Sequence, residues 1–276
     1  MDRLWISSGG FIISTLPYIT CIIKECCRLF RDNGEGESMI RLKDWMTYGW
    51  EEAIRGMRNP LNSWDKSDSQ ICDSGADCEG CIHEKDSCDC FVERRGTYTL
   101  GVRDYSLMKK LRKAGPDHRK FMRMITVYVD ITAPLYWWKE FDTYKVGTVA
   151  NSCSTMHTIH KKEFTFDDFS HEHLISTMGE SYEAMDCLAD IIFCLNKYRD
   201  LYLEADVDKQ KIYWYQMIQL LPSSYNQKRT VMLNYEVLAN MYKSRKNHKL
   251  DEWHVFCDWI KKTLPYSELI TGEESE

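Results

Sequence analysis

The sequence lacks any excess of positive charge. Lysine and arginine together number 36, against 42 aspartates and glutamates, so the formal net charge is −6 at pH 7. A protein that holds a nucleic-acid backbone usually presents a basic surface. The sequence therefore predicts that no nucleic-acid polymer is a partner, whereas a single nucleotide stays open because a few cations suffice to hold it.

Signals of secretion are also missing. No Asn-x-Ser/Thr acceptor for glycosylation stands out. Four of the twelve cysteines, Cys153, Cys187, Cys194 and Cys257, are scattered through apolar segments. This scatter is typical of reduced thiols in a cytosol and not of a disulfide framework. We therefore expect a cytoplasmic protein.

Charge is absent from one long stretch near the N terminus. No charged residue occurs from Leu4 to Ile23, which is about the length of a membrane span. Paired serines, paired glycines and Pro17 interrupt the stretch, and Arg3 is the only cation close before it. The pattern favours a poorly structured leader over residues 1–38, with the working domain at 39–276 and no membrane partner. A signal peptide or an anchor is the alternative.

The rest of the chain predicts a sheet first and helices after it. Apolar alternation, broken only by Arg123, marks residues 121–131 as a half-buried strand, and Pro134 suits a helix start. The 221–224 run would end one helix and cap the next. Three stretches repeat apolar residues at helical spacing: Met185, Leu188, Ile192 and Leu195; Val231, Tyr235, Leu238 and Tyr242; Trp253, Phe256, Ile260 and Leu264. This order indicates an α+β fold.

Aromatic residues are abundant, with nine Trp, sixteen Tyr and ten Phe, and they cluster at 136–138 and 213–215. The clusters indicate an aromatic core. The alternative is a flat-ring site, such as a pocket for a flavin or a base.

A polar, glycine-containing loop ends the stretch 133–157. Loops that follow a strand are where ligands meet backbone N–H groups. Lys139 and Lys145 could neutralise a phosphate there, and Thr148 with two nearby serines could donate hydrogen bonds to it. Cys153 could be activated by neighbouring cations, or it could be a small buried residue in a tight loop. The alternative for the whole stretch is an ordinary strand–helix–loop packed by its aromatics.

A cysteine-rich, acidic insert fills residues 72–90. Its spacing is Cys72-x5-Cys78-x2-Cys81-x6-Cys88-x-Cys90. Cys78, Cys81, Cys88 and Cys90 could supply four thiolates for a structural zinc ion. A reduced loop without metal is the alternative, and the position in an insert favours a stabilising role for any zinc over a catalytic one.

Two blocks of residues follow the order and spacing of one enzyme family. The first comprises Asp44-Trp45-Met46, Ala53-Ile54-Arg55-Gly56 and the stretch 107–134; the second comprises Leu221-Pro222, Tyr225, Asn234, Arg245 and Glu252. From Met39 onward the chain resembles the flavin-dependent thymidylate synthases in this order of motifs.

The family's signature is rewritten in this chain. Counted from Pro134, Glu140 stands at the family's Gln, Thr143-Tyr144-Lys145 at its Arg-His-Arg triplet, Asn151 at its Glu and Cys153 at its Ser, while Thr155 and Ile218 replace arginines. Arg grips a phosphate through a fork of donors, whereas Lys is a point charge. The changes remove much of the family's anion site. They imply a less charged ligand, other contacts to it, or another use of the fold.

The resemblance implies an enzyme with a central, mostly antiparallel sheet packed by long helices. It would bind FAD as hydride carrier, a folate one-carbon donor and a dUMP-like pyrimidine deoxynucleotide that is modified at C5. Substrate contacts would be Lys139, Glu140, Thr143, Lys145, Asn151, Cys153 and Arg245, and cofactor contacts Tyr144, Thr148, Tyr225 and Asn234. Pockets shared between subunits imply a homotetramer, and a rewritten copy would suit a phage or mobile element. The alternative is a non-catalytic nucleotide- or partner-binding protein with a structural zinc knuckle.

Overall fold

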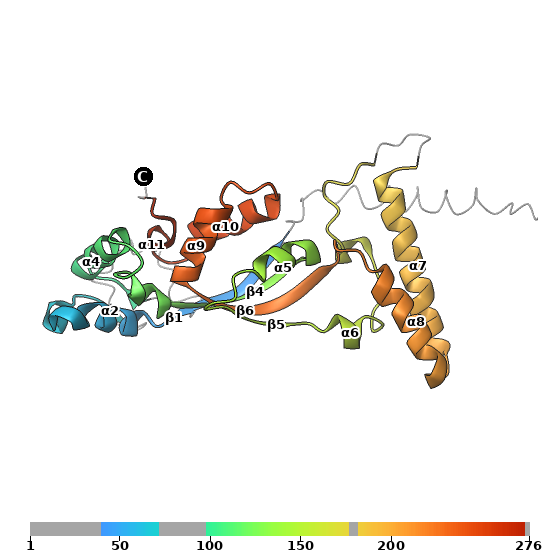
Figure 1. The fold of residues 1–276 in the computed structure, drawn as a ribbon, viewed down its shortest axis with the longest axis horizontal. Helices are drawn as coiled ribbons and strands as arrows, with labels where there is room; N and C mark the ends of the chain where they lie inside the picture. Colours follow the sequence, from blue (N-terminus) through green and yellow to red (C-terminus); the bar gives the residue numbers. More distant parts are fainter. Residues whose placement is uncertain (1–39, 72–97, 177–181, 274–276) are drawn as a thin grey trace, which may run out of the picture. The chain divides into compact units, whose positions relative to one another are not determined.

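The computed structural model describes residues 40–71, 98–176 and 182–273 (Figure 1). The expected leader at 1–38 and the insert at 72–90, with the candidate zinc ligands Cys78, Cys81, Cys88 and Cys90, lie outside these ranges. The leader, the domain boundary and the zinc site therefore stay predictions. Within the described ranges, no helix is long and apolar enough to cross a membrane.

A four-stranded sheet forms the centre of the fold. Its strands are β1 (Arg41–Tyr48), β4 (Thr126–Pro134), β6 (Asn226–Asn234) and β5 (Val149–Ser152), in the spatial order β1-β4-β6-β5. Every neighbouring pair is antiparallel, which confirms the α+β class and the antiparallel sheet. A separate two-stranded sheet joins β2 (Gln70–Ile71) to β3 (Tyr98–Thr99), on either side of the insert.

Strand β4 shows how the sequence selects one buried face. Alternate residues are at most 1% exposed, and those between them lie on the opposite face: Val127, Val129, Ile131 and Ala133 are buried, and Thr126, Tyr128, Asp130 and Thr132 are not. The strand starts later than the alternation predicts, because the preceding residues form the 3-10 turn η3 (Lys120–Arg123). Arg123, which breaks the alternation, lies exposed in that turn.

Helices cover the buried face of the sheet and enclose the main core. The helices that contribute to it are α2 (Trp50–Arg58), α4 (Val102–Lys113), α5 (Leu135–Phe141), α9 (Tyr235–Arg245), α10 (Asp251–Thr263) and α11 (Glu268–Thr271), with the short turns η1 (Asn59–Leu61) and η2 (Trp64–Lys66) after α2. Figure 1 shows α5, α9 and α10 on one side of the sheet. Trp137, Trp138 and Trp253 are at most 1% exposed and pack ring against ring. These aromatics therefore build the core.

A second, smaller core lies between α7 (Ala184–Glu204), α8 (Val207–Leu220) and the stretch that contains β5, α6 (Thr155–Thr158) and η4 (Phe166–Asp168). Its buried members are Leu188, Ile192 and Leu195 of α7, Met217 of α8, and Ile159, Phe164 and Phe169. The periodic residues that predicted a helix at 185–195 thus face this core, which confirms that prediction.

Two sequence expectations about the region around Val231 are wrong. Val231 does not open a helix, because it lies in β6, which pairs with β4 on one side and β5 on the other. The 221–224 run ends α8 at Leu220, as predicted, but it leads into this strand and caps no following helix. The following helix, α9, begins only at Tyr235, and the Asn234 side chain caps it. The apolar residues on both sides of the junction lie close enough in sequence to imitate one helical period.

The opposite face of the sheet carries an exposed apolar row. Met46, Tyr128, Met232 and Val149 stand in register across the four strands. Tyr128 is 42% exposed and Val149 is 61% exposed, and Tyr48 packs edge-on against Tyr128. Side chains of this kind usually lie beneath another surface when they form a row.

Candidate functional site

Arg245, at the end of α9, is the centre of a cluster of candidate residues. Its Nε donates to the Tyr144 hydroxyl at 3.0 Å, and its Nη1 donates to Glu140 Oε2 at 2.5 Å. The guanidinium lies over the Trp253 ring at 4.8 Å from the centroid, and its side chain is 17% exposed. The fold thus brings together three residues that the sequence analysis assigned to ligand binding: Glu140, Tyr144 and Arg245.

His248 completes this cluster, and sequence reasoning missed it. Its Nδ1 accepts from the Leu250 backbone N–H at 3.1 Å. The proton of the neutral ring is therefore on Nε2, which lies 3.2 Å from Glu140 Oε2 and donates to it. The Glu140 carboxylate is held by both Arg245 and His248. The only signal in the sequence was that His248 follows Arg245 by three residues, in the turn before α10.

The Glu140 carboxylate decides the charge of this cluster. It stands where the resembling family has a neutral Gln, and its ion pair with Arg245 offsets the charge that would attract an anion. Among the described residues, none accepts a hydrogen bond from Arg245 Nη2. Arg245 therefore keeps one donor for a ligand but presents little net charge to it.

A second group of candidate residues lies at the other end of α9. Asn234 Oδ1 accepts from the Val237 N–H at 3.0 Å and so caps the helix. Gly147 has φ 79°, and a Cβ there would lie only 2.7 Å from Asn234 Nδ2. The neighbouring Thr148 has a buried hydroxyl that no described residue hydrogen-bonds. A buried hydroxyl without a partner is costly, so this loop offers a hydrogen bond to a ligand.

The two groups stand apart in one subunit. Helix α9 has eleven residues, with Asn234 before its first and Arg245 as its last. At a rise of 1.5 Å per residue, its ends lie about 16 Å apart. A ligand that contacts Asn234 and Arg245 of one chain must therefore be long.

The remaining candidate residues are mostly exposed. Lys139, Thr143 and Lys145 lie on or just after α5, and Thr143 Oγ1 donates to the Glu140 carbonyl at 2.7 Å. Asn151 and Cys153 lie exposed at the end of β5, where the Cys153 N–H donates to the Lys228 carbonyl at 2.9 Å. Cys153 is therefore not the small buried residue of a tight loop. The Cys153 carbonyl accepts from the Gln227 side-chain amide at 3.1 Å, so both of these hydrogen bonds involve the Cys153 backbone and not its thiol.

Tyr225 lies in the second core and not in either group. Its ring packs against Phe164 and Phe169. Burial raises the pKa of its phenol, and the charge of Asp168 adds to this effect. Its assignment to cofactor binding stays a prediction.

A buried hydrogen-bond network adjoins the Arg245 cluster. The Tyr136 hydroxyl donates to Glu252, which is 3% exposed, and lies 3.1 Å from Ser170 Oγ. Burial and the hydrogen bond to Glu252 raise the pKa of Tyr136, so the phenol stays protonated. Tyr136 and Glu140 are four residues apart on α5 and share one face of it. The network therefore fixes α10 against the helix that carries Glu140.

Comparisons with known proteins identify similar structures but no similar sequences. No family model matches the chain, and no curated protein matches it. Among solved structures, two of the flavin-dependent thymidylate synthase ThyX from Helicobacter pylori, each with FAD and dUMP, are similar to it. Both are 14% identical with a TM-score of 0.55, and they cover 84% of this chain and 98% and 97% of their own. The likeness shows a ThyX-like fold. In the described part of the chain, no group of His, Cys, Asp and Glu is arranged to hold a metal.

Proposed function

We propose that the protein is a flavin-dependent thymidylate synthase-like enzyme. It acts on a pyrimidine deoxynucleotide and methylates or otherwise modifies C5 of a dUMP-like substrate. The cluster of Glu140, Tyr144 and Arg245 carries the proposal. These residues come from two separate parts of the sequence and meet where the resemblance assigns substrate and cofactor contacts. The ThyX-like fold supports the same reading.

The residues around Asn234 fit FAD through hydrogen bonds. The buried Thr148 hydroxyl needs a partner, and the Asn234 amide faces the same loop. Lys139 and Lys145 are exposed and would meet a phosphate as point charges. When bound, FAD supplies the hydride, with a folate as the expected one-carbon donor. The protein's part is to orient the rings and to exclude water.

We also propose that a second copy of the chain completes each site in a homotetramer. The Asn234 and Arg245 groups are about 16 Å apart along α9. A second copy could bring its Asn234 group beside the Arg245 group of the first, so that one nucleotide contacts both. The exposed row of Met46, Tyr128, Met232 and Val149 offers the apolar contact that such an assembly needs.

One observation favours the alternative, a non-catalytic nucleotide- or partner-binding protein on the same scaffold. Arg245 is already paired with Glu140, stacked on Trp253 and bonded to Tyr144. An arginine held in this way stabilises the packing of α5, α9 and α10 without any ligand. The two functions differ in whether the protein binds FAD.

The first experiment is a visible absorption spectrum of the purified protein, before and after addition of excess FAD. We expect a protein-bound flavin band at roughly 450 nm, whose shape changes when dUMP is added. A protein that neither retains nor takes up FAD is not a flavoenzyme, and this result would leave the binding protein as the function.

Glu140→Gln tests the site directly. The change restores the neutral residue of the resembling family and releases the charge of Arg245. We expect dUMP to bind more tightly, on the order of tenfold, because a like charge near the phosphate is removed. Glu163→Gln, which neutralises an exposed carboxylate elsewhere, is the matched control. Equal effects of the two variants would place the nucleotide away from Arg245.

A further inference from the structure

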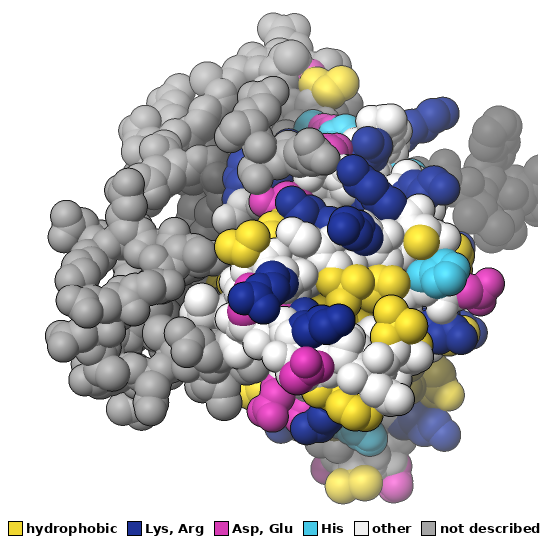
Figure 2. All heavy atoms as spheres, turned by 90° about the vertical axis from the view of Figure 1, so that its left-hand side faces the viewer, with side chains coloured by type: hydrophobic (Ala, Val, Ile, Leu, Met, Phe, Trp, Pro, Cys, Tyr) yellow, Lys and Arg dark blue, Asp and Glu magenta, His cyan; other side chains and the backbone are white. Residues whose placement is uncertain are grey.

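A strongly basic stretch lies outside the site described above. Between residues 102 and 124 the chain carries eight lysines and arginines against two aspartates, although the whole chain has a net charge of −6. One of those aspartates, Asp104, is buried against Arg58 and so contributes nothing to the surface. Figure 2, which faces the side of Figure 1 where α2 and α4 lie, shows Lys and Arg side chains gathered there. The excess of lysine and arginine in this stretch favours a positive local potential.

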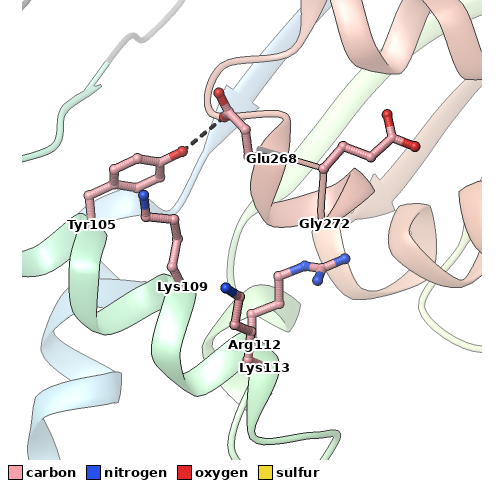
Figure 3. Close-up of a pocket in the computed structure, with 7 residues that line it drawn as sticks. Tyr105, Lys109, Arg112, Lys113, Glu268 and Gly272 are labelled. Carbon is pink, nitrogen blue, oxygen red and sulfur yellow. Dashed lines mark hydrogen bonds between the residues drawn. The ribbon is translucent and has the colours of Figure 1, made fainter. Parts of the chain in front are cut away.

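A pocket of about 240 Å³ opens between α4 and α11 within this stretch. One wall of the pocket is formed by a single face of α4, which carries Tyr105 and the cations Lys109, Arg112 and Lys113. This wall is called the basic wall below. Glu268, Gly272 and Glu273 form the opposite wall. Figure 3 shows the Lys109 and Lys113 side chains and the Arg112 guanidinium directed into the space between the two helices.

Arg112 is held in a fixed position with one nitrogen to spare. Its Nε donates to the Leu269 carbonyl at 2.7 Å, and its Nη2 donates to the Ile270 carbonyl at 3.0 Å. Nη1 has no acceptor among the described residues. Gly272, at φ 75°, leaves room for it, since a Cβ there would lie 2.4 Å from Nη1. Burial, helped by the charge of Arg119, lowers the pKa of Arg112, as happens to a guanidinium without a neutralising anion.

The carboxylates of the pocket already accept hydrogen bonds from other protein groups. Glu268 accepts from the Tyr105 hydroxyl at 2.9 Å. Glu273 accepts from the Tyr242 hydroxyl at 3.0 Å and from Lys261 at 3.1 Å. Within the described ranges, no carboxylate pairs with Lys109, whose ammonium lies over the Tyr105 ring at 4.6 Å. Lys109 and Arg112 Nη1 therefore keep positive charge available for a ligand.

We propose that this pocket binds the phosphate group of a small hydroxylated phosphate monoester. Lys109 and Arg112 Nη1 would donate to the phosphate, and the acceptor-only carboxylates opposite would receive hydroxyl groups of the ligand body. A monocarboxylate would leave the basic wall with unbalanced charge. None of the residues proposed for FAD or the nucleotide lines this pocket, so it is a separate binding site.

The structure offers a matched pair of variants to test the site. Lys109 lines the pocket, whereas Lys110, the next residue on the same helix, is exposed and does not. Lys110 lies in the last turn of α4, where a cation stabilises the helix without any ligand, so a loss of helix stability would appear at least as strongly in Lys110→Ala. Lys109→Ala and Lys110→Ala therefore separate a specific site from helix stabilisation and from diffuse attraction.

The experiment titrates inorganic phosphate, and then glycerol 3-phosphate, into the full chain at constant ionic strength. The signals are isothermal titration heat and 31P line broadening. We expect saturable binding, weakened about tenfold or more in Lys109→Ala and changed less than about twofold in Lys110→Ala. Glycerol 3-phosphate should bind more tightly than phosphate.

Three results would overturn the proposal. They are no saturable binding, equal losses in the two lysine variants, and loss of binding in Arg245→Lys with Lys109→Ala unaffected. The last would place the phosphate at the proposed nucleotide site. Because the readouts need no flavin, the pocket can fail or succeed independently of the proposed enzyme function.

Discussion

Replacing Asp104 by Asn should destabilise the protein by about 3–5 kcal/mol, because a buried arginine would lose its counter-ion. Asp104 is 0% exposed and Arg58 is 5% exposed, and Arg58 Nε donates to Asp104 Oδ1 at 2.6 Å. Asp104 Oδ2 accepts from the hydroxyls of Ser67 and Ser69, each at 2.7 Å. An amide keeps one acceptor oxygen and turns an NH₂ group toward partners that donate. The charge and part of the network are therefore lost together.

Urea unfolding measures this difference, provided that the slope against denaturant is unchanged. Asp258→Asn is the matched control, because Asp258 forms an exposed ion pair with Lys262 at 2.7 Å. The same chemical change there should cost less than about 1 kcal/mol. Similar losses in the two variants, or a loss below about 1 kcal/mol in Asp104→Asn, would refute the reasoning.

The remaining predictions concern pH, backbone, assembly and the site. Burial alone would raise the pKa of Asp104, but hydrogen bonds from Ser69, Ser67 and Arg58 outweigh it and hold the pKa below the usual 3.8. The stability that this carboxylate contributes is thus present above the unfolded pKa and lost as pH falls through the folded pKa. The difference in unfolding free energy between wild type and Asp104→Asn, measured by urea unfolding, should therefore shrink below about pH 4. A difference that stays constant down to about pH 2 contradicts this. Gly147→Ala should cost about 1–3 kcal/mol in the same assay, because the residue has φ 79° and its Cβ would meet Asn234; no loss would mean that the loop moves freely. Tyr128→Lys should lower the mass of the assembly in light scattering if the apolar row is its interface, and an unchanged mass would exclude this face. Arg245→Lys should weaken dUMP binding at least about tenfold, since the fork to Tyr144 and Glu140 is lost, and unchanged binding would remove Arg245 from the substrate site.

Part of the fold could be predicted from short-range patterns. The alternation through Val127, Val129 and Ile131 predicted a half-buried strand because a strand presents every second side chain to one face. The spacing of Leu188, Ile192 and Leu195 predicted a helix for the corresponding reason. Both patterns depend on neighbours within a few residues. The strand β6 was not predicted, because its apolar residues continue into α9. Only the pairing of β6 with β4 and β5 separates the two elements.

For the candidate site, too, the sequence predicted some features and not others. The order of motifs along the chain identified Glu140, Tyr144, Asn234 and Arg245 as residues of interest. It could not show that Glu140 neutralises Arg245 or that His248 supports both, because these residues meet only when α5, α9 and α10 pack around Trp253.

The sequence by itself determined the class of fold and the burial of Trp137 and Trp138, whereas Tyr215 of the second aromatic cluster is 43% exposed. Only the tertiary structure decided which charges meet, as with Arg245 and Glu140, and which stay available, as with Lys109 beside Arg112. The physical reason is that hydrophobic periodicity acts within one element, whereas charges are neutralised by whichever side chains the packing of several elements brings within a few ångströms.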